Sequence, residues 1–432
     1  MTRMTRAARF TALAGALALT LLTTSAAAEP DTPGSGRQSA AQSGQTVLEA
    51  RYDLGDLAFE PPAAIGYVGR SEVSGTVYYP ADFQERRNPV VFVQHGSWAT
   101  CADAEAEAAL EAAREARDRA EEQGDEEEAT RQQEIMDQAS RLLWAWPCAK
   151  GTARLPSDEG YDYLGRALAA RGFVVVSMGA NGINATAGGQ ADTVYRARAA
   201  LIEHHMRLWR RLADTGSGPL GGALVSVRTG DRVGAAFRGS LDLDRVGLAG
   251  HSMGGGGVMQ EVADTHRASW PDGVDIKAAF ALAPTATWDI DPVTRTPFAV
   301  MWGTCDSVNT GEYYEWNSPA NRAPVFKYTL DGGNHAYYNR QWSPSSEQVT
   351  SRNDALPGTR PGNCLSQYPS SQPQAEHEQL TEAQQRRITV HRVTAFFEHF
   401  LQGKEESLPY LTGKKSFPGE PDVTTTLYDA GA

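Results

Sequence analysis

Ser252 lies in a short glycine-rich stretch, Gly-His-Ser-Met-Gly at residues 250–254, whose residue types could perform nucleophilic chemistry. An apolar run at 246–249 precedes it, and residues 258–263 after it favour a helix. A serine at such a strand-to-helix turn sits on a strained backbone that exposes its hydroxyl, and the flanking glycines let strand and helix approach closely. We therefore expect Ser252 to be a catalytic nucleophile.

A serine hydroxyl is a weak nucleophile at neutral pH and needs a base, for which histidine is the usual residue. Of the nine histidines, His335 stands in a flexible Gly-Gly-Asn-His loop at 332–335, after the last expected core strand. His95 and His251 adjoin the glycines of two motif loops, and the other six lie in or near expected helices. His335 is therefore the predicted base.

A third residue must orient the imidazole, and it is expected in the loop after the last strand but one. Asp306 stands there, and Asp291 and Asp331 are the alternatives. The resulting order along the chain is Ser252, Asp306, His335. This is the order of α/β-hydrolases, and it differs from the order in unrelated serine-protease folds.

Acyl transfer also requires donors for a developing oxyanion. The backbone N–H of Met253, directly after the nucleophile, is one expected donor, and the loop after the strand expected at 90–93 supplies the other. Ser97 is the predicted second donor, with Trp98 as the alternative. Four tryptophans could line an acyl or aromatic subsite, although core packing is the commoner role of any one of them: Trp98, Trp144, Trp146 and Trp288.

No metal or cofactor motif accompanies these residues. His204 and His205 are adjacent and would point in different directions on a helix, and zinc-binding spacings of histidine or cysteine are absent. The glycine run at 254–257 follows a reactive serine and has no Walker lysine. We therefore expect neither a metal nor a cofactor.

Short apolar runs bounded by turn residues predict strands that are covered on both faces. They lie at residues 76–79, 90–93, 173–176, 246–249, 278–282, 298–301 and 325–328. Helical stretches alternate with them at 161–171, at 191–212, after Ser252 and at 381–401. This alternation predicts an α/β fold, a doubly wound and mostly parallel sheet with helices on both sides.

A block rich in alanine, glutamate and arginine at 102–147 interrupts the alternation and predicts two antiparallel helices joined at Gly124-Asp125. It contains fourteen acids and five arginines, a net charge of −9. Charge runs usually mark exposed faces, so a solvated hairpin without a further role is one interpretation. Because the block follows the loop of the second oxyanion donor, a lid over the cleft is the other.

The first 28 residues carry arginines at 3, 6 and 9, an apolar stretch at 10–22 and alanines at 26–28, the pattern of a secretory signal peptide. No later segment is long and apolar enough to span a bilayer, so no stable membrane insertion is expected. We expect a secreted, extracellular chain. Residues 29–45 would be a disordered leader, and residues 46–432 one α/β-hydrolase domain that carries the hairpin insert.

Cysteines of an exported chain are expected to pair, because the compartment is oxidising. Three pairings of the four are possible, and the nearest-neighbour pairing, Cys101 with Cys148 and Cys305 with Cys364, fits the predicted architecture. The formal net charge of −13 becomes −16 when the three signal-peptide arginines are removed. A chain so acidic is not expected to bind nucleic acid.

The chain resembles secreted α/β-hydrolases of the dienelactone hydrolase, platelet-activating-factor acetylhydrolase and bacterial cutinase grouping, over residues 65–405 apart from the insert. The stretch at 250–257 is similar to the motif of actinobacterial cutinases and poly(ethylene terephthalate) hydrolases. The resemblance implies a triad of Ser252, Asp306 and His335.

The chain also departs from those polyester hydrolases in three places. It has His-Gly-Ser at 95–97 where they carry a Pro-Gly-Tyr loop, and Thr285 where they place a substrate-clamping tryptophan. They also lack the acidic hairpin. A polyester is therefore not the first expectation for its natural substrate.

We expect a serine carboxylic-ester hydrolase of esterase or lipase type that works through an acyl-enzyme on a small-molecule, lipid or polymeric ester. A cutinase-like polyester hydrolase is the alternative, followed by a peptidase or an acyltransferase, since the fold does not fix the acyl group. A non-catalytic binding protein that uses the acidic hairpin for recognition is the alternative from another class.

Overall fold

The structure is a computed structural model that describes residues 46–285, 291–346, 348–351, 362–365, 375–421 and 423–429. The expected signal peptide and leader at 1–45 lie outside the described residues, as does Trp288. The chain from Gly44 onward forms one compact unit. Within the described part, no helix is both long enough and apolar enough to cross a membrane.

Twelve strands are found among the described residues. They are β1 (Val47–Asp53), β2 (Ser74–Pro80), β3 (Asn88–Gln94), β4 (Val174–Met178), β5 (Val225–Ser226), β6 (Leu241–His251), β7 (Ile276–Leu282), β8 (Phe298–Gly303), β9 (Val325–Leu330), β10 (Asn363–Leu365), β11 (Glu376–Glu378) and β12 (Val423–Tyr428). β10 and β11 pair only with each other, and the other ten form one sheet.

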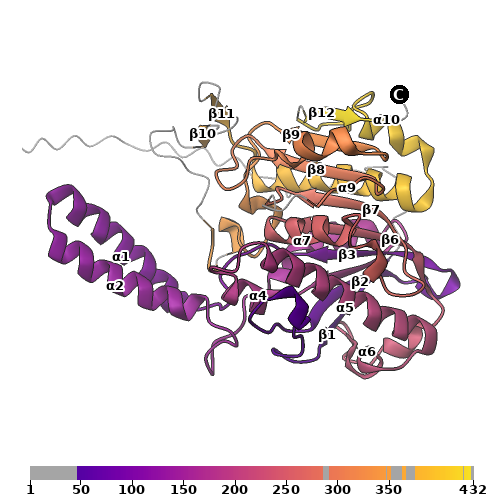
Figure 1. Cartoon of the computed structure of the whole chain (residues 1–432), viewed down its shortest axis with the longest axis horizontal. Coiled ribbons are helices and arrows are strands. Elements are labelled where there is room, and N and C mark those ends of the chain that lie inside the picture. The colour runs from indigo at the N-terminus through magenta and orange to yellow at the C-terminus, as the bar shows by residue number, and fades with distance from the viewer. Residues whose placement is uncertain are drawn as a thin grey trace, which may run out of the picture. The chain divides into compact units, whose positions relative to one another are not determined.

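The large sheet has the strand order β12-β9-β8-β7-β6-β3-β4-β2-β1-β5 (Figure 1). The pairs between β9 and β4 are all parallel. The pairs outside that block are antiparallel. A mixed α/β fold around a large, mostly parallel sheet is therefore present, and the carboxyl ends of its central strands share one edge.

The edges of the sheet differ from the prediction. β2 was expected among parallel strands but pairs antiparallel with both of its neighbours. β1, β5 and β12 were not predicted at all. β1 alternates buried and exposed positions at its end, and only half of the β12 residues are even partly buried, so neither carries the continuous apolar run of a strand covered on both faces.

Ten α-helices are described, most of which pack on the sheet. They are α1 (Ala104–Gln123), α2 (Glu126–Leu143), α3 (Asp162–Ala169), α4 (Asn181–Thr186), α5 (Thr193–Thr215), α6 (Pro219–Ala223), α7 (Met253–Val262), α8 (Tyr313–Asn317), α9 (Glu382–Gln402) and α10 (Leu408–Leu411). The four helical stretches predicted from the sequence correspond to α3, α5, α7 and α9.

Alternate side chains of the central strands enter two separate cores, one on each face of the sheet. Val90 and Phe92 of β3 belong to a core with side chains of α5 and α7. Val91 and Val93 belong to a core with side chains of α3 and α9. Full burial of one such side chain stabilises the fold by roughly 1.5–3 kcal/mol, so both faces favour apolar residues and the strand sequence is continuously apolar.

The insert forms the predicted helical hairpin, with a capped helix on each side of its turn. The Asp103 carboxylate accepts from the Ala106 N–H at 2.9 Å, and the Asp125 carboxylate accepts from the Glu128 N–H at 3.0 Å. Gly124, with φ of +72°, ends α1 in the left-handed conformation that glycine adopts without strain. Each helix therefore has its own start signal, which explains why the pattern could be read from the sequence.

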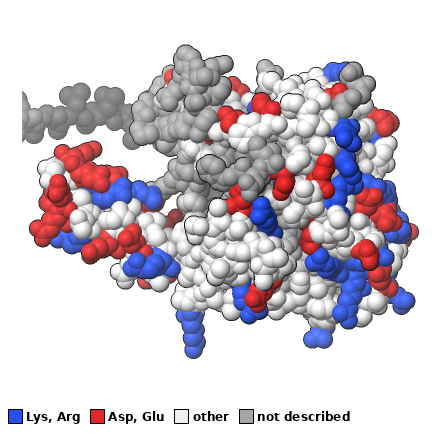
Figure 2. All heavy atoms as spheres, viewed as in Figure 1, with Lys and Arg blue, Asp and Glu red and all other residues white. Residues whose placement is uncertain are grey.

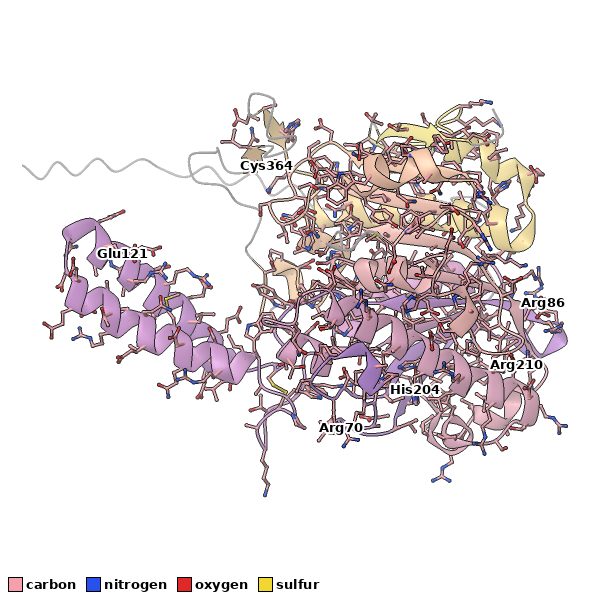
Figure 3. All side chains as sticks on the ribbon, viewed as in Figure 1. Arg70, Arg86, Glu121, His204, Arg210 and Cys364 are labelled. Carbon is pink, nitrogen blue, oxygen red and sulfur yellow. A yellow bond between two sulfur atoms is a disulfide. The ribbon has the colours of Figure 1, made fainter. Side chains whose placement is uncertain are left out.

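The hairpin extends away from the sheet (Figure 1), and Glu121 lies near its outer end (Figure 3). Acidic side chains dominate its visible surface (Figure 2). At its base, Cys101 is bonded to Cys148, with Cα atoms 5.7 Å apart. The outer part is therefore solvated, whereas the base is fixed to the body of the molecule.

A small apolar cluster joins the hairpin base to the sheet domain. We call it the base cluster, and its buried members are Ala99, Ala106, Ala139, Leu143, Leu155, Trp342 and Val349. These residues come from the loop after β3, from both hairpin helices, from the segment after α2 and from the segment after β9. The hairpin is thus packed against two loops that the sequence assigned to chemistry.

Candidate active site

Ser252 occupies the turn between β6 and α7 with φ of +54° and ψ of −124°, a strained conformation for a residue with a side chain. The glycines on either side of it, Gly250 and Gly254, have no room for a side chain. A Cβ on Gly250 would lie 2.3 Å from the Gly254 oxygen, and a Cβ on Gly254 would lie 2.3 Å from the Gln94 oxygen. Ser252 is therefore at a strained strand-to-helix turn between two crowded glycines, and its role as a nucleophile stays a prediction.

His335 and Asp306 are in direct contact. His335 Nδ1 lies 2.8 Å from Asp306 Oδ2, and the two side chains are 6% and 1% exposed. The other carboxylate oxygen, Oδ1, accepts from the backbone N–H groups of Val308 and Asn309, both at 2.8 Å. Because a carboxylate accepts, Nδ1 donates to Asp306, and in the neutral form of the ring the lone pair is then on Nε2.

The two alternative acids have other partners. Asp331 pairs with His377 at 2.5 Å, and its side chain is 68% exposed. Asp291 accepts from the Gln260 amide at 2.8 Å. The structure therefore brings Asp306, of the three candidate acids, to Nδ1 of His335.

A contact between the His251 side chain and the His335 main chain places His335 beside the residue that precedes Ser252. The carbonyl of His335 accepts from Nε2 of His251, the residue before Ser252, at 3.0 Å. The rings of His251 and His335 have centroids 5.0 Å apart. Burial, with the neighbouring His335 adding to it, holds the pKa of His251 well below its usual range. His251 is therefore neutral and donates from Nε2 while Nδ1 accepts from the Tyr161 hydroxyl at 2.9 Å.

The loop after β3 lies directly against Ser252. A Cβ on Gly96 would lie 2.5 Å from the Ser252 Cβ and 3.3 Å from its Oγ. The Gly96 carbonyl points toward the Asn184 amide, which donates to it at 3.0 Å. The N–H of Ser97 belongs to the same peptide and leaves it on the opposite side, because a trans peptide directs its C=O and N–H apart.

Met253 is the first residue of α7, so its N–H has no acceptor within the helix. One predicted oxyanion donor thus comes from the start of a helix and the other from a loop peptide whose carbonyl is hydrogen-bonded. The sequence motifs predicted both donors, and their role stays a prediction. They gave no indication of what holds the loop.

The predicted substrate tryptophans have packing partners in the structure. Trp98 donates from its ring nitrogen to the Val349 carbonyl at 2.8 Å, and it makes an edge contact with Trp144 beside the base cluster. Trp146 donates to the Asp56 carbonyl at 2.8 Å. Trp98 directly follows Ser97 in the sequence, and it links the loop after β3 to the hairpin base.

Trp342 was not predicted, and it contacts residues of both glycine loops around the site. It is 2% exposed, and its ring centroid lies 6.3 Å from that of His95 and 5.2 Å from that of His251. It also belongs to the base cluster. Its position seven residues after His335 carries no motif, and only the fold brings it between the two glycine loops.

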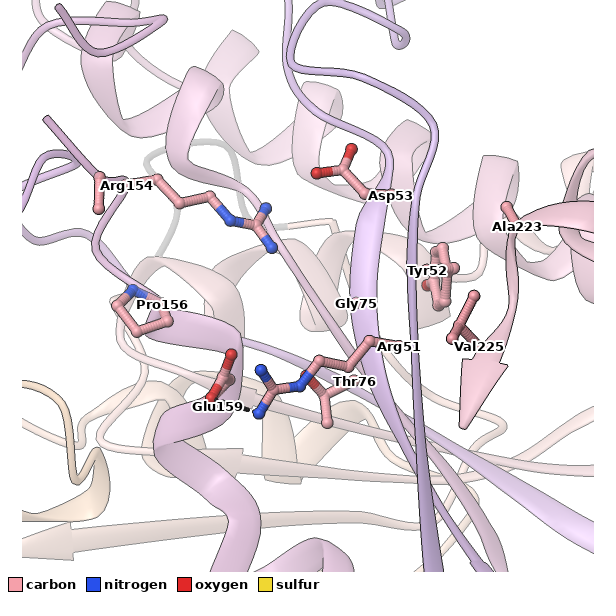
Figure 4. A pocket seen from close by; sticks show the side chains of 11 residues that line it. Arg51, Tyr52, Asp53, Gly75, Thr76, Arg154, Pro156, Glu159, Ala223 and Val225 are labelled. Carbon is pink, nitrogen blue, oxygen red and sulfur yellow. Dashed lines mark hydrogen bonds and ion pairs between the residues drawn. The ribbon is translucent and has the colours of Figure 1, made fainter. Parts of the chain in front are cut away.

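A cavity of about 520 Å³ lies elsewhere, at the end of the sheet formed by β1, β2 and β5 (Figure 4). Arg51, Asp53, Arg154 and Glu159 line it, and Arg51 and Glu159 form an ion pair of 2.9 Å. No residue of the Ser252, Asp306 and His335 group lines this cavity. The cavity is therefore separate from the candidate site.

No group of three or more histidine, cysteine or acidic residues within the described ranges is arranged to hold a metal ion. The four cysteines form the two disulfides predicted from the sequence, Cys101 with Cys148 and Cys305 with Cys364. No protein-family model matches the chain, and no curated protein is similar to it.

Proposed function

We propose that this chain is a secreted α/β-hydrolase that cleaves carboxylic esters through an acyl-enzyme on Ser252. The observation that carries the proposal is the 2.8 Å contact between His335 Nδ1 and Asp306 Oδ2, with the His335 main chain bound by His251, the neighbour of a serine whose φ is +54°. A strained serine, a buried histidine and a buried aspartate in this chain order are the parts of a nucleophilic acyl-transfer site.

The reaction would proceed in two halves. Ser252 Oγ attacks the ester carbonyl carbon while His335 Nε2 accepts the hydroxyl proton. The tetrahedral intermediate then collapses, the C–O bond to the alcohol breaks, and His335 returns the proton to the leaving alkoxide. In the second half His335 deprotonates a water that attacks the acyl carbon, and the carboxylic acid leaves as Ser252 regains its proton.

Asp306 would keep His335 in the required tautomer and stabilise the imidazolium that forms. Its second oxygen is already occupied by two backbone N–H groups, so the carboxylate has one orientation. The N–H groups of Met253 and Ser97 would bind the oxyanion of the tetrahedral intermediate, which is usually the largest single contribution to such catalysis.

Secretion is part of the proposal. Two disulfides support an oxidising compartment, because such bonds are rare where thiols are kept reduced. Residues 1–28 have the signal-peptide pattern described above. Expression with export in a suitable host, followed by N-terminal sequencing, tests this: a mature chain that begins near residue 29 supports it.

The activity is tested with the mature chain, the Ser252→Ala variant and p-nitrophenyl esters from acetate to palmitate. We expect hydrolysis by the unchanged chain alone, and labelling of that chain alone by a fluorophosphonate probe, which reacts with an activated serine. Absence of both reactions would overturn the proposal and favour the non-catalytic binding protein. A polyester film in the same series tests the cutinase-like alternative.

A further inference from the structure

A guanidinium is buried beneath the loop that carries Ser97. Arg198 of α5 is 0% exposed. Its Nη1 donates to the His95 carbonyl at 2.9 Å, and its Nη2 donates to Oδ1 of Asn184. None of the ion pairs in the described part of the chain includes Arg198, and its Nε has no partner there.

A buried charge without a counter-ion is costly, because the protein must replace the water that solvates it. The carbonyl and amide oxygens beside the loop provide only part of that replacement. Burial lowers the pKa of Arg198 to about 10, so the group still carries its charge at neutral pH. Stability alone would favour an apolar residue in this position.

The contacts of Arg198 converge on one peptide. Asn184, held by Arg198, donates from Nδ2 to the Gly96 carbonyl at 3.0 Å. His95, whose own carbonyl Arg198 binds, contacts the same Gly96 oxygen through Nδ1 at 2.8 Å. His95 Nε2 accepts from the Ala180 N–H at 2.8 Å, so Nδ1 is the nitrogen that carries the proton and donates.

Two donors therefore fix the Gly96 carbonyl, and the Ser97 N–H of the same peptide has a fixed direction on the other side. We propose that Arg198 is a positioning residue: it aims the Ser97 N–H at the oxyanion through Asn184 and His95, and it places a positive charge beneath the loop. This inference rests on the proposed ester hydrolysis. Arg198 itself touches no reacting atom.

A positioned oxyanion donor acts mainly in the transition state, so its loss lowers kcat and leaves KM nearly unchanged. Removal of one such donor costs about 10²–10³ in kcat. A donor that is present but no longer aimed keeps part of that effect, and we expect a loss of about 10–100-fold in kcat for Arg198→Met on that basis. Affinity for a trifluoromethyl ketone, which mimics the oxyanion, should fall by a similar factor.

Arg392 provides a matched control, because it is also a buried arginine. It is 3% exposed on α9, where it contacts Glu420 at 2.7 Å and the Tyr410 carbonyl at 2.8 Å. Arg392→Met should lower the thermal midpoint while the active fraction keeps its kcat. Titration with the fluorophosphonate probe counts active sites in every preparation, so a smaller folded fraction is not mistaken for slower chemistry.

The Asn184→Asp variant distinguishes an effect on the orientation of the Ser97 N–H from an effect on the stability of the fold. An aspartate at this position would pair with Arg198 and satisfy its charge, but it has no N–H for the Gly96 carbonyl. We expect a thermal midpoint equal to or above that of the unchanged chain, together with a loss in kcat similar to that of Arg198→Met. The double variant should be no slower than either single variant, because both act on one peptide.

The outcomes distinguish this inference from the proposed function. If the unchanged chain neither hydrolyses esters nor reacts with the probe, both fail. If the unchanged chain is active and the Arg198→Met and Asn184→Asp variants keep its kcat and its ketone affinity, only the role of Arg198 is overturned. If Arg198→Met does not fold, Asn184→Asp alone decides, since a normal midpoint with normal kcat would contradict the inference.

Discussion

His251 Nε2 donates to the backbone carbonyl of His335 at 3.0 Å, so the residue next to the predicted nucleophile holds the main chain of the predicted base. The Tyr161 hydroxyl completes the chain by donating to His251 Nδ1 at 2.9 Å. All three side chains are buried. His251 thus links the main chain of the predicted base to the turn that carries the predicted nucleophile.

The first prediction concerns this contact. His251→Phe keeps a ring beside Trp342 and removes the hydrogen bond to His335. An unpaired buried carbonyl costs about 1–3 kcal/mol, and we expect the thermal midpoint to fall and kcat/KM to drop about 10-fold as His335 loses its anchor. Tyr161→Phe, which leaves the His251–His335 contact intact, is the control and should lose less. Equal kcat/KM for His251→Phe and the unchanged chain would contradict this role.

Ser252→Ala should abolish ester hydrolysis with little change in the thermal midpoint, because the hydroxyl contributes chemistry and almost no packing. Removal of a triad serine elsewhere costs on the order of 10⁶ in kcat. Initial rates with p-nitrophenyl acetate and a melting curve check both parts. A variant that retains more than about a hundredth of the rate would show that another group is the nucleophile.

Asp306→Asn should be far slower than Asp331→Asn or Asp291→Asn, because Asp306 is the one of these three aspartates that contacts Nδ1 of His335. An amide in this position favours the wrong tautomer, at a cost of about 10⁴ in kcat. The two other variants are internal controls of equal chemical change. A larger loss in kcat for Asp331→Asn would show that Asp306 is not the acid of the triad.

Acid should destabilise the fold through buried histidines. Burial lowers the pKa of His95 and of His205 to about 3, and it also holds that of His251 well below its usual range. The unfolded chain then binds protons that the folded chain does not. The contribution of these histidines to the free energy of unfolding is therefore complete above about pH 6.5 and is lost as pH drops below that value.

Urea unfolding at pH 7.5, 6.0 and 5.0 measures this slope. His205→Gln should make it shallower by up to about 1.4 kcal/mol per pH unit, because one titrating group is removed while an amide can still accept from Tyr52. An unchanged slope would show that His205 is protonated in the folded state. Glu261, whose pKa burial raises, acts in the opposite direction and loses stability as pH rises.

The outer part of the hairpin should be dispensable. Replacing residues 111–138 with a short Gly/Ser turn keeps Cys101, Cys148 and the base cluster, and we expect a normal thermal midpoint and normal hydrolysis of the acetate ester. The ratio of kcat/KM for the laurate ester to that for the acetate ester shows whether the hairpin acts as a lid. Because the outer helices extend away from the sheet, we expect no change in that ratio (Figure 1). A changed ratio would favour the lid.

Much of the central architecture could be predicted from the sequence, and the reason is visible in β3 and β6. Strands covered on both faces must be apolar throughout, and this pattern does not depend on their partners. β1 and β12 lie toward the sheet's edges, where half-exposed residues are tolerated, and their positions depend on the strands that they join. The antiparallel direction of β2 likewise depends on chain connections that no local pattern encodes.

The same division applies to the site. Ser252, Asp306 and His335 were predicted because chemistry demands their types and the fold demands their order. Arg198 carried a weaker signal, a lone arginine among apolar residues on the inner face of α5, since Val194 and Leu201 stand four residues before it and three after it. Trp342 carried none, because its contacts join segments far apart in the chain.

The disulfides set a condition on when the site can exist. Cys305 precedes Asp306 in the chain and is bonded to Cys364, while Cys101, bonded to Cys148, lies four residues after Ser97. Each bond closes a loop that would otherwise be free, and closure of loops of this length contributes about 4 kcal/mol in the chain-entropy treatment. A reduced chain lacks both constraints, so we expect its acid loop and the loop before the hairpin to be less fixed than in the oxidised chain. If the proposed hydrolysis is correct, its rate should fall when the two disulfides are reduced.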